Sequence, residues 1–223
     1  MTLKTEADAI AGIIDRTLAN LAASIGAKTD AAAALRWQIS KLRVDGVRAV
    51  DDGDYIPRLS DCFNAAFALP VSFAGLTLLH NTLLGETIVG EVSDDVVNRS
   101  LLLCIAVEAK LITGFTFTSS DDAQSMMKGM ASVFEAIGEK VVEMDDPSIY
   151  QALISLSASL TNHLASTARP LPRIITFDLQ SSLPALALSE RIYYDPSRWE
   201  EIVDENKIVH PAFSPRTIRG LAR

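Results

Sequence analysis

Histidine, cysteine and paired carboxylates are the groups of this chain that could bind a metal ion or act as an acid, base or nucleophile. The histidines are His80, His163 and His210, and none stands in an HExxH pattern, whose spacing would place two imidazoles on one helix face. Cys62 and Cys104 each lie in an apolar segment, where a buried free thiol is the expected state. A zinc site would need more ligands at closer spacing.

The carboxylate pairs lie at predicted loops and helix starts, where helix capping and solvation account for them. They are Asp51/Asp52, Asp94/Asp95, Asp121/Asp122 and Asp145/Asp146. The sequence also lacks a GxSxG motif, a glycine-rich phosphate loop and a CxxC motif. We therefore expect no catalytic residue, no cofactor and no metal ion, and a protein that is not an enzyme.

The composition is that of a folded protein with an acidic body. Of 223 residues, 48% are hydrophobic and 22% are charged, which is enough to bury a core. The net charge of −8 arises before Pro170, because the later residues hold seven basic and seven acidic side chains. An acidic body repels phosphate, so direct nucleic-acid binding is disfavoured.

The most apolar stretches are interrupted by charged or polar residues, so we expect no membrane span. The first residues lack the basic start and apolar run of a signal peptide, which favours synthesis in the cytoplasm.

Apolar periodicity predicts a helical bundle domain over residues 1–168. We expect Asp30 to cap the second helix and Asp45–Tyr55 to form a loop. The predicted helices are Thr5–Ile25, Asp30–Val44, Pro57–Leu69, Val71–Leu84, Ser93–Ile112, Ser120–Met144 and Pro147–Ala168.

Two prolines in Arg169–Pro172 end the last of these helices, and a different pattern follows over residues 169–223. Arg173–Phe177 has the residues of a strand, and Thr217–Leu221 is a second candidate strand. Between them, Ser182–Tyr194, with Ser182 as its cap, and Pro196–Asn206 are predicted helices. Trp199 is expected either to fill the core of this small unit or to contact a sugar or a partner protein.

The last fifty residues resemble a LysM module, which has a β-α-α-β fold and often binds peptidoglycan or chitin. The matching positions are Leu188, Arg191, Tyr193, Asp195, Pro196, Ser197, Arg198, Trp199, Ile202, Asn206, Ile208 and Pro211. The two loops expected to hold sugar, at 177–182 and 214–216, depart from the sugar-binding form. Together with the helical bundle predicted from periodicity, the resemblance gives a mainly α protein, a helical bundle followed by a LysM-like module, in which docking is favoured over glycan binding.

The same residues more closely resemble the C-terminal half of the Mu-like phage DNA circularisation protein family, a tail and baseplate component. The resemblance rests on Leu183-Pro184, Arg191-Ile192-Tyr193, Glu205-Asn206 and His210-Pro211-Ala212-Phe213, where Ala212 replaces a glycine of the family. It implies a structural part of a phage tail baseplate or hub, or of a related contractile apparatus, located in the virion.

The expected partners are other tail or baseplate proteins and copies of the chain itself. The candidate partner contacts are Arg198, Trp199, Asn206 and His210. Two alternatives stay open: a LysM-type module that binds peptidoglycan in a tail or secretion machine, and a cytoplasmic tail-assembly factor absent from the finished particle.

Overall fold

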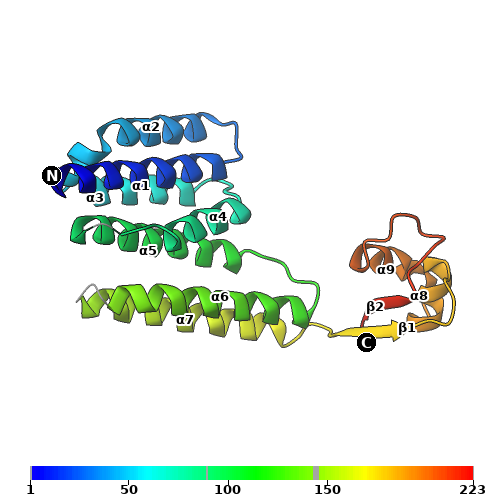
Figure 1. The fold of residues 1–223 in the computed structure, drawn as a ribbon. Coiled ribbons are helices and arrows are strands. Elements are labelled where there is room, and N and C mark those ends of the chain that lie inside the picture. The colour runs from blue at the N-terminus through cyan, green and yellow to red at the C-terminus, as the bar shows by residue number, and fades with distance from the viewer. Residues whose placement is uncertain (1, 89, 143–145, 223) are drawn as a thin grey trace. The chain divides into compact units, whose positions relative to one another are not determined.

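The protein is mainly α-helical, with one two-stranded sheet near its C-terminus, as expected from the sequence (Figure 1). The computed structural model describes residues 2–88, 90–142 and 146–222. Residue contacts divide the chain into two units: the first comprises the described residues of Met1–Phe115 and Met130–Leu160, and the second those of Thr116–Gly129 and Thr161–Arg223. Among the described helices, none is both long and apolar enough to cross a membrane.

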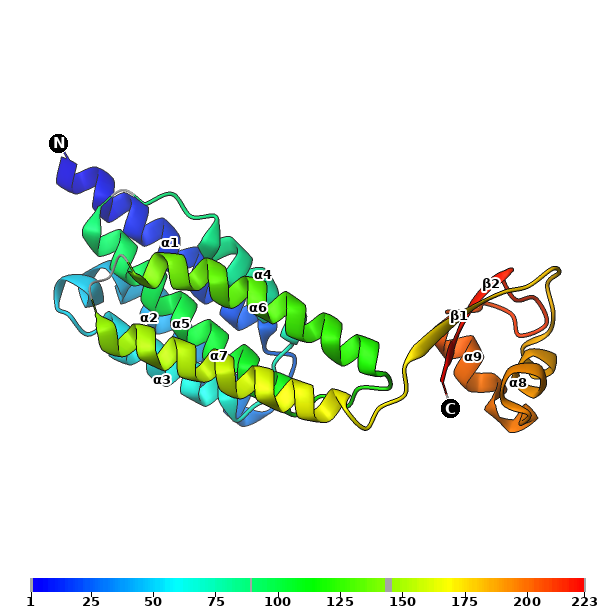
Figure 2. The same ribbon diagram turned by 90° about the horizontal axis from the view of Figure 1, so that it is seen from below.

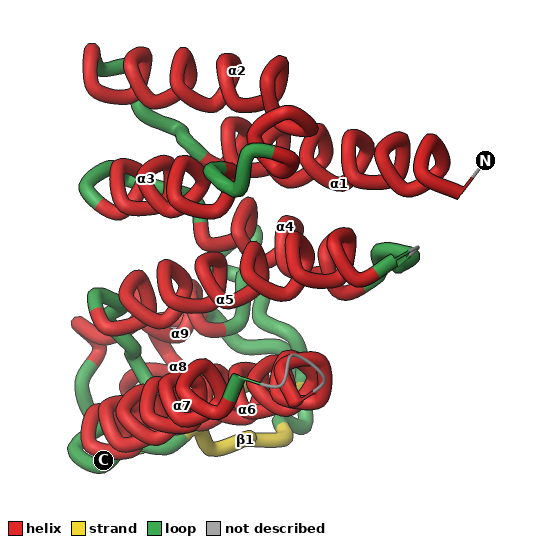
Figure 3. Tube along the Cα trace, turned by 90° about the vertical axis from the view of Figure 1, so that its left-hand side faces the viewer, coloured by secondary structure: helices red, strands yellow, loops and turns green. Residues whose placement is uncertain are grey.

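Five helices make up most of the first unit: α1 (Thr2–Ser24), α2 (Asp30–Asp51), α3 (Tyr55–Phe67), α4 (Phe73–Leu84) and α5 (Glu91–Thr113). Helix α2 packs on α1 and α3, and α4 and α5 pack on the other side of these two helices (Figure 3). The leucine and isoleucine stripe of α1 is fully buried between these layers, so α1 is the centre of the core.

Helix α2 corrects two expectations. The predicted loop from Asp45 to Tyr55 is wrong, because α2 continues to Asp51 and only Asp52–Asp54 separate it from α3. Packing explains the extension, since Gly46 lies so close to α1 that a Cβ atom there would stand 2.6 Å from the Ile14 side chain. The cap is also Thr29 rather than Asp30, and its hydroxyl accepts a hydrogen bond from the amide of Ala32.

Helices α6 (Ser120–Val142) and α7 (Pro147–Ala168) each contribute to both units. Both begin at the predicted residues, whereas the expected end of α6 at Met144 lies outside the described residues. Within the second unit, the amide of Ser120 donates to the carbonyl of Pro172, and the Asp121 carboxylate accepts from the amide of Ile174 at 2.7 Å. The start of α6 therefore holds the segment that leads into the sheet.

The rest of the second unit has the order β1 (Ile174–Asp178), α8 (Ala185–Tyr193), a 3-10 turn (Pro196–Arg198), α9 (Trp199–Glu205) and β2 (Thr217–Leu221). The strands are antiparallel, with Ile174 opposite Leu221 and Asp178 opposite Thr217. Figure 2 shows α8 and α9 beside this pair of strands. Ser182 does not cap α8, because the helix starts after Pro184 and the Ser182 hydroxyl donates to the carbonyl of Ser214.

The predicted change at residue 169 coincides with the end of α7 at Ala168. The contact-based units divide the chain elsewhere, because they assign the start of α6 and the end of α7 to the second unit. The expected domains, 1–168 and 169–223, stay a prediction.

A buried histidine–carboxylate hydrogen bond joins α4 and α5. The Glu108 carboxylate lies 2.8 and 3.0 Å from Nδ1 of His80, and both side chains are almost wholly excluded from solvent. Removing one member of such a pair leaves the other buried without compensation, whereas removing both relieves the desolvation cost.

We predict that Glu108→Leu lowers the free energy of unfolding by about 3–5 kcal/mol, because His80 loses its buried partner. The double variant His80→Leu/Glu108→Leu should recover most of this loss. Chemical denaturation measures both. Arg99→Ala is the control on the same helix: it removes a half-exposed ion pair with Asp95 and should cost about 0–1 kcal/mol. Equal losses for Glu108→Leu and Arg99→Ala would contradict the assignment.

Candidate partner-binding surface

Tyr193 is the central side chain of the small core in the second unit. Its ring packs with Leu188, Ile202 and Ile218, and it is 1% exposed. Its hydroxyl accepts a hydrogen bond of 2.9 Å from the amide of Leu221, which ties the end of α8 to β2. Burial, helped by the neighbouring Glu201 carboxylate, raises the pKa of Tyr193 to about 12. The buried aromatic of this unit is thus Tyr193, whereas Trp199 is only half-buried.

Gly220, on β2, lies against the Tyr193 hydroxyl. A Cβ atom at this position would lie 2.9 Å from the hydroxyl oxygen and 3.3 Å from the Phe177 ring. Glycine is therefore what lets the strand approach the tyrosine closely.

Arg198, the first predicted partner contact, is engaged within the unit. Its guanidinium lies 3.8 Å from the centre of the Tyr193 ring and donates through Nε and Nη2 to the Glu201 carboxylate at 2.7–3.0 Å. A planar guanidinium that stacks on a ring and forms a two-pronged bond to a carboxylate is well ordered. A partner contact by Arg198 and Trp199 stays a prediction.

Asn206, the next predicted contact, joins α9 to β2. Its Oδ1 accepts from the amide of Arg219 at 2.8 Å, and its Nδ2 donates to the carbonyls of Arg219 and Ile202 at 2.7 and 2.9 Å. The amide side chain thereby pairs with the outer edge of β2 as a neighbouring strand would. Its hydrogen-bonding groups serve the fold of the unit, so the geometry gives it a structural role.

His210, the last predicted contact, is exposed in residues 207–216, which we call the C-terminal loop. Its Nδ1 accepts from the amide of Ala212 at 3.2 Å, and its carbonyl accepts from the amide of Phe213 at 2.9 Å. The His210 and Phe213 rings lie 5.5 Å apart at an angle of 44°. These contacts fold the loop tightly around Pro211.

The C-terminal loop is also fastened to the start of α8. The amide of Ala185 donates to the carbonyl of Pro211 at 2.7 Å. The Ser214 hydroxyl accepts from the amide of Leu183 and donates to its carbonyl, and the Ser214 carbonyl accepts from the Ser182 hydroxyl. The loop is therefore held at Pro211 and at Ser214.

Large apolar side chains on and beside this loop face solvent. Val209 is 101% exposed, Phe213 is 73% exposed, and Leu186, next to the anchored Ala185, is 58% exposed. An exposed aromatic on an ordered loop is the kind of residue that anchors protein interfaces. Phe213 belongs to the His210–Phe213 stretch on which the family resemblance rests, but it was not among the predicted partner contacts. Its position between Pro211 and Pro215 was a signal, because prolines restrict the conformation of the loop that carries it.

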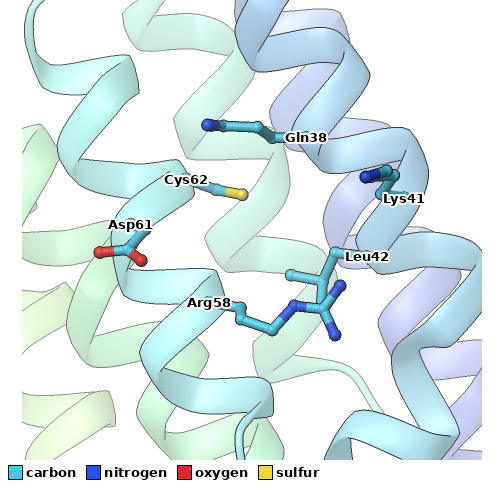
Figure 4. A pocket seen from close by; sticks show the side chains of 6 residues that line it. All are labelled: Gln38, Lys41, Leu42, Arg58, Asp61 and Cys62. Carbon is cyan, nitrogen blue, oxygen red and sulfur yellow. The ribbon is translucent and has the colours of Figure 1, made fainter.

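The first unit offers a different candidate, a hollow of about 220 Å³ between α2 and α3 (Figure 4). Gln38, Lys41, Arg58 and Cys62 line it, but it is smaller than common ligand pockets. Burial raises the pKa of the Cys62 thiol to about 11, Asp61 adds to this effect, and Arg58 opposes it. At neutral pH Cys62 is thus a thiol rather than a nucleophilic thiolate.

Among the described residues, no group of three or more histidine, cysteine or acidic side chains could hold a metal ion. His80 is paired with Glu108, and the carbonyl of His163 accepts from the hydroxyls of Ser166 and Thr167 within α7. The C-terminal loop is therefore the best-supported candidate surface.

We predict that Asn206→Ala speeds hydrogen exchange of the Arg219 amide by at least about tenfold, because this amide loses its acceptor. Asn206→Asp, which keeps an acceptor but loses both donated bonds, should have an intermediate effect. The measurement is amide exchange by NMR. Unchanged exchange in Asn206→Ala would contradict the structural role of this side chain.

We also predict that Cys62 alkylates far more slowly in the folded protein than in the unfolded chain at about pH 8, because less of it is thiolate. The alkylation rate should rise with a midpoint near pH 11 rather than near the ordinary thiol value of 9.0. Cys104, whose pKa burial also raises, should react more slowly still. Mass spectrometry of quenched iodoacetamide reactions measures both sites, and a midpoint near 9 for Cys62 would contradict the prediction.

Comparison with known proteins does not identify a function for this surface. No protein-family model matches the chain, and no curated protein matches it either. The two resemblances of the last fifty residues stay expectations, and the case for a function rests on the residues of the C-terminal unit.

Proposed function

We propose that this protein is a structural component of a phage tail baseplate or hub, or of a related contractile apparatus. In this proposal the helical body packs on neighbouring subunits and the LysM-like C-terminal unit docks to other tail proteins. The β-α-α-β order of the second unit supports the proposal, because it is the order that the resemblance implies. The supporting antiparallel pair joins β1 and β2, the first and last elements of that order.

The observation that carries the proposal is the exposed apolar tip of the C-terminal loop. Phe213 and Val209 face solvent although hydrogen bonds hold the loop at Pro211 and Ser214. A loop that is ordered before binding loses little conformational entropy when it binds. An ordered loop with an exposed aromatic suits a docking role better than a catalytic one.

Glycan binding, the main alternative, is less well supported. The two loops expected to hold sugar are bonded to each other through Ser182, Leu183 and Ser214. Sugar recognition needs polar groups that are available to hydroxyls, whereas these groups already have partners in the protein. The same loops are better suited to presenting Phe213 than to enclosing a sugar.

We predict that Phe213→Ser lowers incorporation of the protein into purified particles by at least about tenfold, because the interface loses its aromatic anchor. Quantitative mass spectrometry of particles from cells that carry the variant gene measures this. Val44→Ser, an equally mild change at an 84% exposed position of α2, is the matched control and should incorporate normally.

In the same assay, Arg198→Ala tests the partner contact that was predicted from the sequence. Normal incorporation of Phe213→Ser would contradict docking through the loop. Absence of the unaltered protein from purified particles would contradict the structural role and favour an assembly factor.

A further inference from the structure

A groove in the first unit is apolar like the C-terminal loop but carries the opposite charge. Its volume is about 580 Å³, and it lies between the second half of α6 and the first half of α7. Its walls include Val142, Tyr150 and Ile154, which are 64%, 40% and 51% exposed. Gly138 and Ala158 are among its small lining residues and leave room for an inserted side chain.

The charge of this groove is one-sided. Glu135 and Glu139 line it four residues apart on α6, and its described lining includes no lysine or arginine. Neither carboxylate forms an ion pair with any residue that the structure describes. Two like charges at this spacing repel each other on an isolated helix. Helix α7, the other wall, has no Asp, Glu, Lys or Arg between residues 147 and 168. The groove is thus apolar with an acidic rim, which favours an occupant that is apolar and basic.

The C-terminal loop of the same protein has this chemistry. Lys207 and Arg216 flank its apolar residues, and no acidic residue occurs from 206 to 223. Both basic side chains are exposed, and neither is in an ion pair within the described residues, whereas Arg219 is paired with Glu205. Between them, Val209 and Phe213 are exposed and can enter an apolar groove.

We propose that the C-terminal loop of one molecule docks in the α6–α7 groove of a second copy of this chain. Phe213 and Val209 fill the apolar floor, and Lys207 and Arg216 lie against Glu135 and Glu139. The match of charges selects the occupant, because complementary charges steer association and exclude other partners.

Such a contact joins two different surfaces, so each molecule keeps one groove and one loop available. Association of this type continues from molecule to molecule and either closes into a ring or extends as a chain. A single ten-residue loop makes a small interface, so association should be weak and depend on concentration and salt. This inference rests on the proposed function for the choice of the loop as a docking element and names its partner.

The test uses the full-length protein in sedimentation velocity at rising concentration and low ionic strength. Phe213→Asp removes the loop anchor and keeps the groove, whereas Ile154→Asp blocks the groove and keeps the loop. Both positions are exposed, so both variants should keep the circular dichroism and thermal unfolding of the unaltered protein. Val209→Asp and Val142→Asp form a second such pair, and Val44→Asp on α2 is the control.

We expect the unaltered protein and Val44→Asp to associate, and each single variant of either pair to stay monomeric. Mixing Phe213→Asp with Ile154→Asp should give a one-to-one dimer that grows no further, because only one intact groove and one intact loop meet. Glu139→Arg and Arg216→Glu should each weaken association by at least about tenfold, and combining them in one chain should restore it.

Three results overturn the inference: an unaltered protein that stays monomeric, a single variant that still associates alone, or a mixture that forms no dimer. A monomer whose loop variants still fail to enter particles would overturn this inference and leave the proposed function standing. Self-association by loop and groove in a protein that never enters particles would contradict the proposed function and leave this inference standing.

Discussion

The hydrogen bond between the Tyr193 hydroxyl and the amide of Leu221 is the constraint on which the second unit depends. It joins the last residue of α8 to the last residue of β2, which lie 28 residues apart in the sequence. Leu188, Tyr193, Ile202 and Ile218 form its small buried cluster, and Tyr193 is the largest of them. In the roughly fifty residues from the start of β1 to the end of β2 the hydrophobic core contributes little, so fixed polar contacts carry more of the stability than in a large domain.

The polar contacts around Tyr193 share a consistent arrangement. Arg198 covers the ring, Asn206 pairs with the free edge of β2, and Ser214 fastens the C-terminal loop to the start of α8. Each contact uses hydrogen-bonding groups that a partner or ligand would otherwise engage. Val209 and Phe213 remain exposed beside the basic side chains of Lys207 and Arg216, so the loop can bury apolar surface in a partner.

The first unit meets a different requirement. Its core is large, and it holds the buried side chains of His80 and Glu108, which are hydrogen-bonded to each other. In the groove formed by α6 and α7, exposed apolar residues lie beside two carboxylates. The two units thus carry surfaces of opposite charge and shared apolar character, which is the physical basis for expecting this chain to bind copies of itself.

Local signals in the sequence predicted the elements that depend on local chemistry. Pro147 starts α7 and Ala168 ends it, and β2 spans Thr217–Leu221, all as predicted. The end of α2 could not be predicted, because it depends on Gly46 packing against Ile14 of a different helix. The role of Asn206 was missed for a similar reason, since its partner Arg219 comes from a strand that only the fold brings near.

For the candidate surface too, the sequence identified the region, whereas the exposure of its side chains depends on the fold. The sequence drew attention to His210 and to the residues around it, but exposure depends on how the loop folds back on Ser182 and Ala185. Phe213 would be a core residue in a differently folded loop, so its type alone did not reveal its role.

Docking as proposed requires that the C-terminal loop is held in one conformation before it meets a partner. Backbone ¹⁵N relaxation on the free full-length protein, diluted until it is monomeric, measures this order. We expect order parameters for Val209 and Phe213 close to the rigid-backbone value of about 0.85. Values below about 0.6 at these residues, with rigid values in β1 and β2, would contradict it.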